Sequence, residues 1–128
     1  MAFAQPCVPV PSGLVSWWPG EGNFIDIQGA NDGADAGGTT FVAGMVGQAF
    51  NFDGTANSYI SIANDPELIP ATNELTICAW VNPDFSAGSV LNTILTTRSG
   101  CSGNVAYNLN FFTPTPFVNL GMSDSGGA

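Results

Sequence analysis

The sequence predicts an all-β fold of short antiparallel strands, and three observations support this. Sixteen Gly and nine Pro residues are spread over 128 residues, a composition typical of a chain with many turns. No long apolar pattern has the 3.6-residue period of a helix, so we expect almost no helix. Several segments instead alternate apolar and polar residues with a period of two and are rich in β-branched and aromatic side chains, as half-buried strands are.

The clearest strand signals are FNFDGTANSYISI at residues 50–62 and LTICAWVNP at residues 75–83. Gly, Asn or Pro bounds each of them, and these residues favour turns. The same criteria predict about eight strands at short, regular intervals, which favours a β-sandwich or a barrel. In chain order the predicted strands are residues 14–18, 39–42, 48–52, 59–63, 75–81, 92–97, 106–112 and 116–122.

Four features refine this outline. A Gly/Asn/Asp loop over residues 19–38 contains the run FIDI at 24–27, whose apolar side chains we expect to pin the loop to the core. Alternation places Trp17 and Trp18 on opposite faces of their strand, so at least one should pack in the core. Cys78 lies inside a predicted strand and is interpreted as a small buried apolar residue. Gly44 and Gly47 are expected to turn the chain between the second and third strands.

The chain has ten carboxylates and a single cationic side chain, Arg98, and it has no Lys and no His. Because Lys and Arg supply most nucleic-acid affinity, nucleic acid and anionic membranes are poor partners. No apolar run is long enough for a membrane-spanning helix, so we expect no membrane insertion. Most carboxylates sit beside Gly, Asn or Pro, where they would serve as solvated turn residues.

The N-terminal segment predicts a secreted or cell-surface protein. Residues 1–13 contain three prolines and are interpreted as an extended leader, and Ala2-Phe3-Ala4 fits the end of a secretory signal. Three cysteines fit an extracellular location, where disulfides form, only in part, because an odd number leaves one thiol unpaired. A disulfide between Cys7 and Cys101, both in loop-like segments, is a hypothesis that mass spectrometry with and without reduction tests.

Residues 13–83, and more loosely those up to about 122, resemble the laminin-G-like domains. The opening GLVSWWPGEG, the loop DIQGANDG and the segment GMVGQAFNFDG occur in the order typical of the family, followed by the YISI and LTICAWV strands. The resemblance implies an antiparallel β-sandwich of the concanavalin A-like jelly-roll type over residues 14–128. The later Trp strand and hairpin of the family have no counterpart here, so the chain is expected to be the N-terminal portion of a larger domain.

Catalysis is not expected. The absence of His and Lys excludes Ser-His-Asp and Cys-His machinery and Schiff-base chemistry. Two carboxylates could hydrolyse a glycoside, but the glucanases of this fold carry clustered acidic residues on one strand, whereas Glu21, Glu67 and Glu74 are isolated.

A structural calcium site is the favoured cofactor hypothesis. Calcium needs several carboxylate and carbonyl oxygens on a loop, and the related jelly rolls commonly hold calcium in such loops. The candidate ligands are Asp26, Asn31, Asp32 and Asp53. In the alternative interpretation, Asp26 and Asn31 tie their loop to its own backbone, and Asp53 makes an Asx turn before Gly54.

Ligand binding by such modules relies on aromatic rings and on Asn or Asp near loops. Tyr59, Asn57 and Trp80 are the candidate ligand residues, although core packing competes with ligand stacking for each ring. Two functions remain open: a non-catalytic extracellular module that binds a glycan or a protein, and a structural subunit that associates with itself by strand addition.

Overall fold

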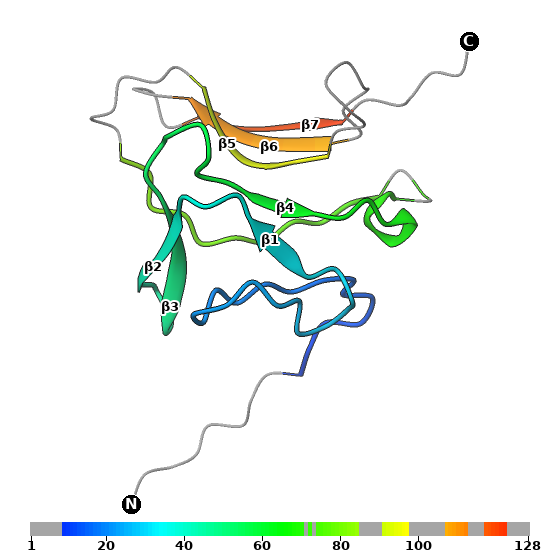
Figure 1. The fold of residues 1–128 in the computed structure, drawn as a ribbon. Helices are drawn as coiled ribbons and strands as arrows, with labels where there is room; N and C mark the ends of the chain where they lie inside the picture. The colour runs from blue at the N-terminus through cyan, green and yellow to red at the C-terminus, as the bar shows by residue number, and fades with distance from the viewer. Residues whose placement is uncertain are drawn as a thin grey trace, which may run out of the picture. The chain divides into compact units, whose positions relative to one another are not determined.

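The structure is a computed structural model that describes residues 9–70, 72, 74–84, 91–97, 107–112 and 117–122 (Figure 1). The chain forms two compact units, Met1–Thr76 and Ile77–Ala128. The described residues contain seven strands in three antiparallel sheets and one short 3-10 helix. The prediction of an all-β, antiparallel fold with almost no helix is therefore confirmed, and the sheets are small, with two, two and three strands.

The first unit contains two strand pairs. Strand β2 (Thr39–Ala43) pairs with β3 (Gln48–Phe52) as a hairpin, close to the predicted ranges. Gly44 donates its N–H to the carbonyl of Gly47 at 2.9 Å, and Gly47 has a φ of 60°, which glycine adopts without strain. Glu21 accepts the N–H of Gln48 at 3.2 Å and so fastens the base of this turn to the preceding loop.

Strand β1 (Gly33–Asp35) pairs with β4 (Ile60–Ile62). Gly33 and Asp35 have low strand propensity, and β1 lies inside residues 19–38, for which the sequence predicts a loop. Strand β1 forms because its backbone pairs with that of Ile60–Ile62. Because the pairing comes from a segment about 27 residues away, local sequence carries little sign of it.

Phenylalanine rings pack against one another in the first unit. Phe24 lies 5.1 Å from Phe41 and 5.7 Å from Phe50 between ring centroids, within the range of favourable aromatic pairs. Phe24 therefore pins the loop to the hairpin, as predicted. Ile25 and Ile27 do not take part, because they are 49% and 56% exposed.

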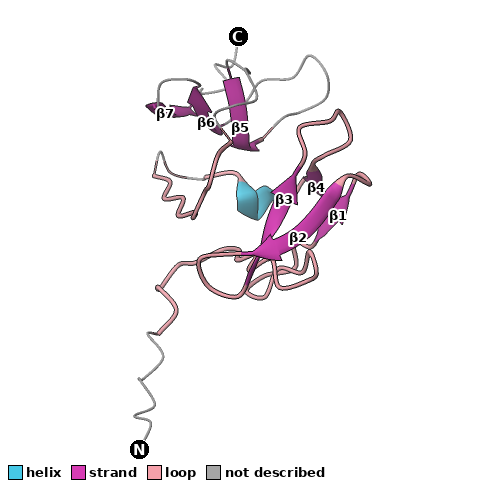
Figure 2. Ribbon diagram, turned by 90° about the vertical axis from the view of Figure 1, so that its left-hand side faces the viewer, coloured by secondary structure: helices cyan, strands magenta, loops and turns pink. Residues whose placement is uncertain are grey.

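The 3-10 helix Pro66–Leu68 follows β4 and is drawn in cyan in Figure 2. Asp65 caps it, accepting the N–H of Glu67 at 2.8 Å, and Pro66 supplies a fixed φ at the first helical position. The sequence Asp-Pro-Glu is thus a short cap signal between two predicted strands.

The second unit contains a three-stranded sheet of β5 (Leu91–Thr96), β6 (Tyr107–Phe112) and β7 (Phe117–Met122), with β6 in the middle. All three agree with the predicted ranges to within one residue at each end. A bulge interrupts the β5–β6 register between Thr93 and Leu95. Tyr107 on β6 is the one large apolar side chain among the described residues that is buried, at 6% exposed.

Two predicted strands are wrong. Residues 14–18 form no ladder, because the N–H of Trp17 is bonded to a side chain, Asp26. Residues 75–81 are also not paired in a sheet. Alternating apolar and polar residues indicate an extended chain with one face toward the protein and one toward solvent. A β-strand also needs a partner strand to which its backbone can bond. Cys78 is exposed rather than buried, which corrects its interpretation as a core residue.

No helix among the described residues is long and apolar enough to cross a membrane.

Candidate functional site

The best-organised polar site among the described residues is centred on Asp26. Its Oδ1 accepts the backbone N–H groups of Trp17, Gln28 and Gly29 at 2.8, 3.0 and 3.0 Å. Its Oδ2 accepts the N–H of Asn31 at 3.3 Å. The side chain is only 4% exposed. One buried carboxylate therefore satisfies four backbone donors that no strand or helix satisfies.

Asn31 and Asp32 complete this arrangement. The buried Asn31 donates from Nδ2 to the hydroxyl of Ser16 at 3.0 Å, and its carbonyl accepts the indole N–H of Trp18 at 2.7 Å. Asp32 Oδ1 accepts the backbone N–H of Asp26 at 2.8 Å. These bonds join residues 16–18 to the loop at 26–32, and they explain why Trp18 is partly buried while Trp17 is 47% exposed.

The electrostatics of Asp26 follow from these bonds. Burial by itself raises the pKa of the carboxyl, but the backbone N–H groups of Trp17, Gly29 and Gln28, together with the hydroxyl of Ser16, outweigh it and lower the pKa from 3.8 to about 2. A carboxylate that accepts several hydrogen bonds is stabilised in its charged form. Asp26 therefore stays ionised at physiological pH and is poorly suited to act as a general acid or base.

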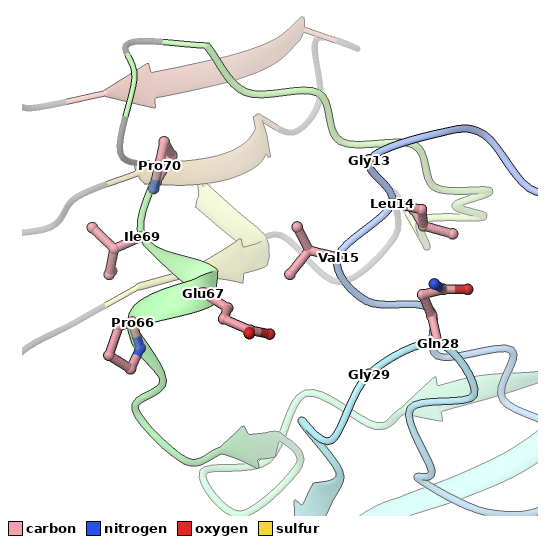
Figure 3. Close-up of a pocket in the computed structure, with 9 residues that line it drawn as sticks. All are labelled: Gly13, Leu14, Val15, Gln28, Gly29, Pro66, Glu67, Ile69 and Pro70. Atoms are coloured by element: carbon pink, nitrogen blue, oxygen red, sulfur yellow. The ribbon is translucent and has the colours of Figure 1, made fainter.

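A surface depression of about 590 Å³ lies beside this loop (Figure 3). Residues 13–15 and Gln28-Gly29 form one side of it, and the 3-10 helix with Ile69 and Pro70 forms the other. Figure 3 shows the side chains of Val15 and Glu67 directed toward the space between the two sides. Glu67 is the one charged residue in its lining, which otherwise combines polar and apolar surface.

Gly29 fits closely between the depression and the Asp26 site. A Cβ at this position would lie 2.8 Å from Asp26 Oδ2 and 2.8 Å from the carbonyl oxygen of Val15. Both distances are shorter than a Cβ contact allows. The loop therefore needs glycine here for close approach, and the shape of this wall depends on the same bonds that hold Asp26.

The predicted calcium ligands are only partly brought together. Asp26, Asn31 and Asp32 share one loop, but the Asp26 oxygens face N–H donors, whose positive ends compete with a cation. Asp53 instead accepts the N–H and the hydroxyl of Thr55 at 2.9 and 2.8 Å, as in an Asx turn, and these bonds lower its pKa. Over the residues that the structure describes, no three His, Cys, Asp or Glu side chains gather as a metal group. The bonds match the alternative interpretation, and calcium stays a prediction that a titration tests.

The predicted ligand residues are all at the surface. Tyr59 is 52% exposed and Trp80 is 82% exposed, and Asn57 is exposed as well. Tyr59 and Asn57 belong to the first unit and Trp80 to the second. Each unit therefore carries candidate residues of its own.

The predicted disulfide partners, Cys7 and Cys101, lie outside the described residues. Cys78 is a free thiol at the surface.

Some residues of the site were missed by sequence reasoning. Ser16 and the backbone N–H of Trp17 contribute through contacts that span 15 and 9 residues. Local pattern does not reveal such contacts. The helix cap at Asp65-Pro66, by contrast, has a recognisable signal that places Glu67 and Ile69 at the depression.

No protein-family model, curated protein or solved structure matches this chain.

Proposed function

We propose that this chain is a non-catalytic binding module of a secreted or cell-surface protein, with a glycan or a protein as its ligand. The observation that carries the proposal is the exposure of Trp80, whose side chain is 82% accessible to solvent. Tryptophan is usually well buried, and exposed tryptophans are enriched at interaction sites because one flat ring supplies a large apolar contact.

The surroundings of Trp80 suit such a contact. Val81 is 48% exposed, and the amide side chain of Asn82 is exposed as well. An indole ring can stack on the apolar face of a sugar, while a nearby amide can bond to its hydroxyls. This combination favours the glycan over the protein ligand, and Tyr59 with Asn57 would offer a similar pairing in the first unit.

The proposal includes a laminin-G-like fold and the absence of catalysis. The ordered motifs of residues 13–83 and the β2–β3 hairpin support a laminin-G-like jelly roll. The absence of His and Lys from the chain and the low pKa of the buried Asp26 support binding without catalysis. Calcium would be a structural addition to this function and is not required for it.

A glycan array tests the proposal. We expect the chain to bind a subset of glycans, and we expect Trp80→Ala to lose that signal. Trp17→Ala is the matched control, because Trp17 is 47% exposed and holds Asp26 through its backbone N–H and not through its ring. Equal signals from the parent chain and Trp80→Ala would contradict the role of Trp80. The absence of any glycan signal would exclude a glycan as the ligand.

A second candidate function, self-association by strand addition, is favoured by the apolar surface. Sixteen large apolar side chains among the described residues are at least 42% exposed. Burying part of this surface against another chain would stabilise the protein. Sedimentation tests this candidate, because a strictly monomeric protein at every concentration would contradict it.

A further inference from the structure

In the part of the chain that the structure describes, strand β7 lies at an edge of its sheet. Among the described residues it is bonded to β6 alone, and Figure 2 shows β6 between β7 and β5. An open edge carries unpaired N–H and C=O groups and can template pairing with another strand. Which of these groups face outward follows from the register of the sheet.

The outward groups are those of Val118, Leu120 and Met122. Thr97 donates its N–H to the carbonyl of Tyr107 at 3.0 Å, so the backbone groups of Tyr107 face β5 and those of its neighbour Asn108 face β7. Asn108 lies opposite Gly121. Backbone direction alternates along a strand. Asn119 and Gly121 therefore bond to β6, and the backbone groups of the three alternate residues point away from it.

The same three residues carry exposed apolar side chains. Val118, Leu120 and Met122 are 65%, 49% and 48% exposed, and alternation places them on one face of the sheet. Leu120 lies opposite Leu109 of β6 in the register. The edge thus combines unpaired backbone groups with an apolar face that continues onto β6.

The uncharged strands of this sheet suit pairing with a second copy of this chain. Eight of the ten carboxylates belong to the first unit, which has no Lys or Arg, whereas the second unit contains Asp84, Asp124 and Arg98. The sequences of β5, β6 and β7 contain no Asp, Glu, Lys or Arg. Two copies with a net charge of −9 repel each other, and like charges brought close together oppose association. A contact between two β7 strands pairs segments that themselves contain no carboxylate.

We infer that β7 pairs antiparallel with β7 of a second copy, about a two-fold axis at Leu120. In this register Leu120 faces Leu120 of the other copy and Val118 faces Met122, so all outward N–H and C=O groups of these three residues are paired. The apolar side chains stay on one face, because residues directly opposite each other share a face. A two-fold contact closes as a dimer and joins the two sheets into one. This inference rests on the self-association proposed above and names the strand that mediates it.

Analytical ultracentrifugation of the full chain tests the inference. We expect a monomer–dimer equilibrium that Leu120→Lys weakens by at least about tenfold, since it places two ammonium groups opposite each other in place of an apolar pair. Met45→Lys is the matched control, because Met45 is 69% exposed in the β2–β3 turn and gains the same charge. It should leave the equilibrium unchanged.

The possible outcomes distinguish the β7 contact from self-association in general. A parent chain that stays monomeric at every concentration overturns both. A dimer that Leu120→Lys does not weaken, or that Met45→Lys weakens equally, overturns the β7 contact and leaves self-association standing.

Hydrogen exchange on the unmodified chain gives a second test that does not depend on any variant folding. The Leu120 amide should gain protection as concentration rises, whereas the Asn119 amide should be protected throughout by β6. Leu120 exchange that is independent of concentration in a dimeric sample overturns the inference.

Discussion

Replacing Asp26 with Asn should destabilise the chain strongly at neutral pH and hardly at all in acid. The Asp26 carboxylate is 4% exposed and accepts four backbone N–H groups. Its pKa falls from 3.8 to about 2 on folding. At about 1.4 kcal/mol for each pKa unit, this difference contributes roughly 2.5 kcal/mol of stability at neutral pH.

The pH window follows from the direction of the shift. Because the folded-state pKa is the lower one, the unfolded chain binds the proton first as the pH falls below about 4. The contribution of Asp26 is therefore complete above that pH and is lost as the pH falls toward 2. The Asn side chain has no charge to lose, and its NH₂ group would meet an N–H donor of the loop.

Urea unfolding at a series of pH values measures this effect. We expect Asp26→Asn to lower the free energy of unfolding by about 2 to 3 kcal/mol at pH 7, and we expect the gap to close as the pH approaches 2. Glu74→Gln is the matched control, since it removes one charge from an exposed side chain and should change stability by less than about 0.5 kcal/mol. A gap that is constant with pH, or no larger than that of the control, would refute the reasoning.

Two further predictions concern the neighbouring loop and the free thiol. Gly29→Ala should cost about 1 to 3 kcal/mol of unfolding free energy, because its Cβ would meet Asp26 Oδ2 and the Val15 carbonyl at 2.8 Å; unchanged denaturant unfolding would contradict this close approach. Cys78 is exposed, so a thiol reagent should modify it in the folded protein without denaturant, and Cys78→Ser should remove one fast-reacting equivalent. An equal number of fast thiols in the parent and the variant would show that Cys78 is covered.

The strands that sequence predicts well include β2 and β3, whose turn is also encoded locally. Strands β2 and β3 are joined by a turn that needs the positive φ of Gly47, and both lie within one residue of the predicted ranges. The last three strands are also located to within one residue at each end. In these segments local pattern and tertiary pairing agree.

The failures occur where pairing depends on distant residues. Residues 14–18 have the pattern of a strand, but the N–H of Trp17 is taken by Asp26 nine residues away. Strand β1 has a poor pattern and still forms, because Ile60–Ile62 pairs with it. The acidic loop was recognised as a polar site from its composition. Three of the four N–H donors to Asp26, those of Gln28, Gly29 and Asn31, lie in its own loop, as the alternative interpretation of the sequence expects. The bond from Trp17 could not be predicted, because that donor comes from a separate segment.

Calorimetric titration of the chain and its tryptophan variants with a glycan identified on the array is the most direct measurement of the proposed function. We predict that Trp80→Ala weakens binding by about thirtyfold, which corresponds to the loss of about 2 kcal/mol typical of a central tryptophan contact. Trp17→Ala should retain the parent affinity. Equal affinities for the parent chain and Trp80→Ala would contradict the account.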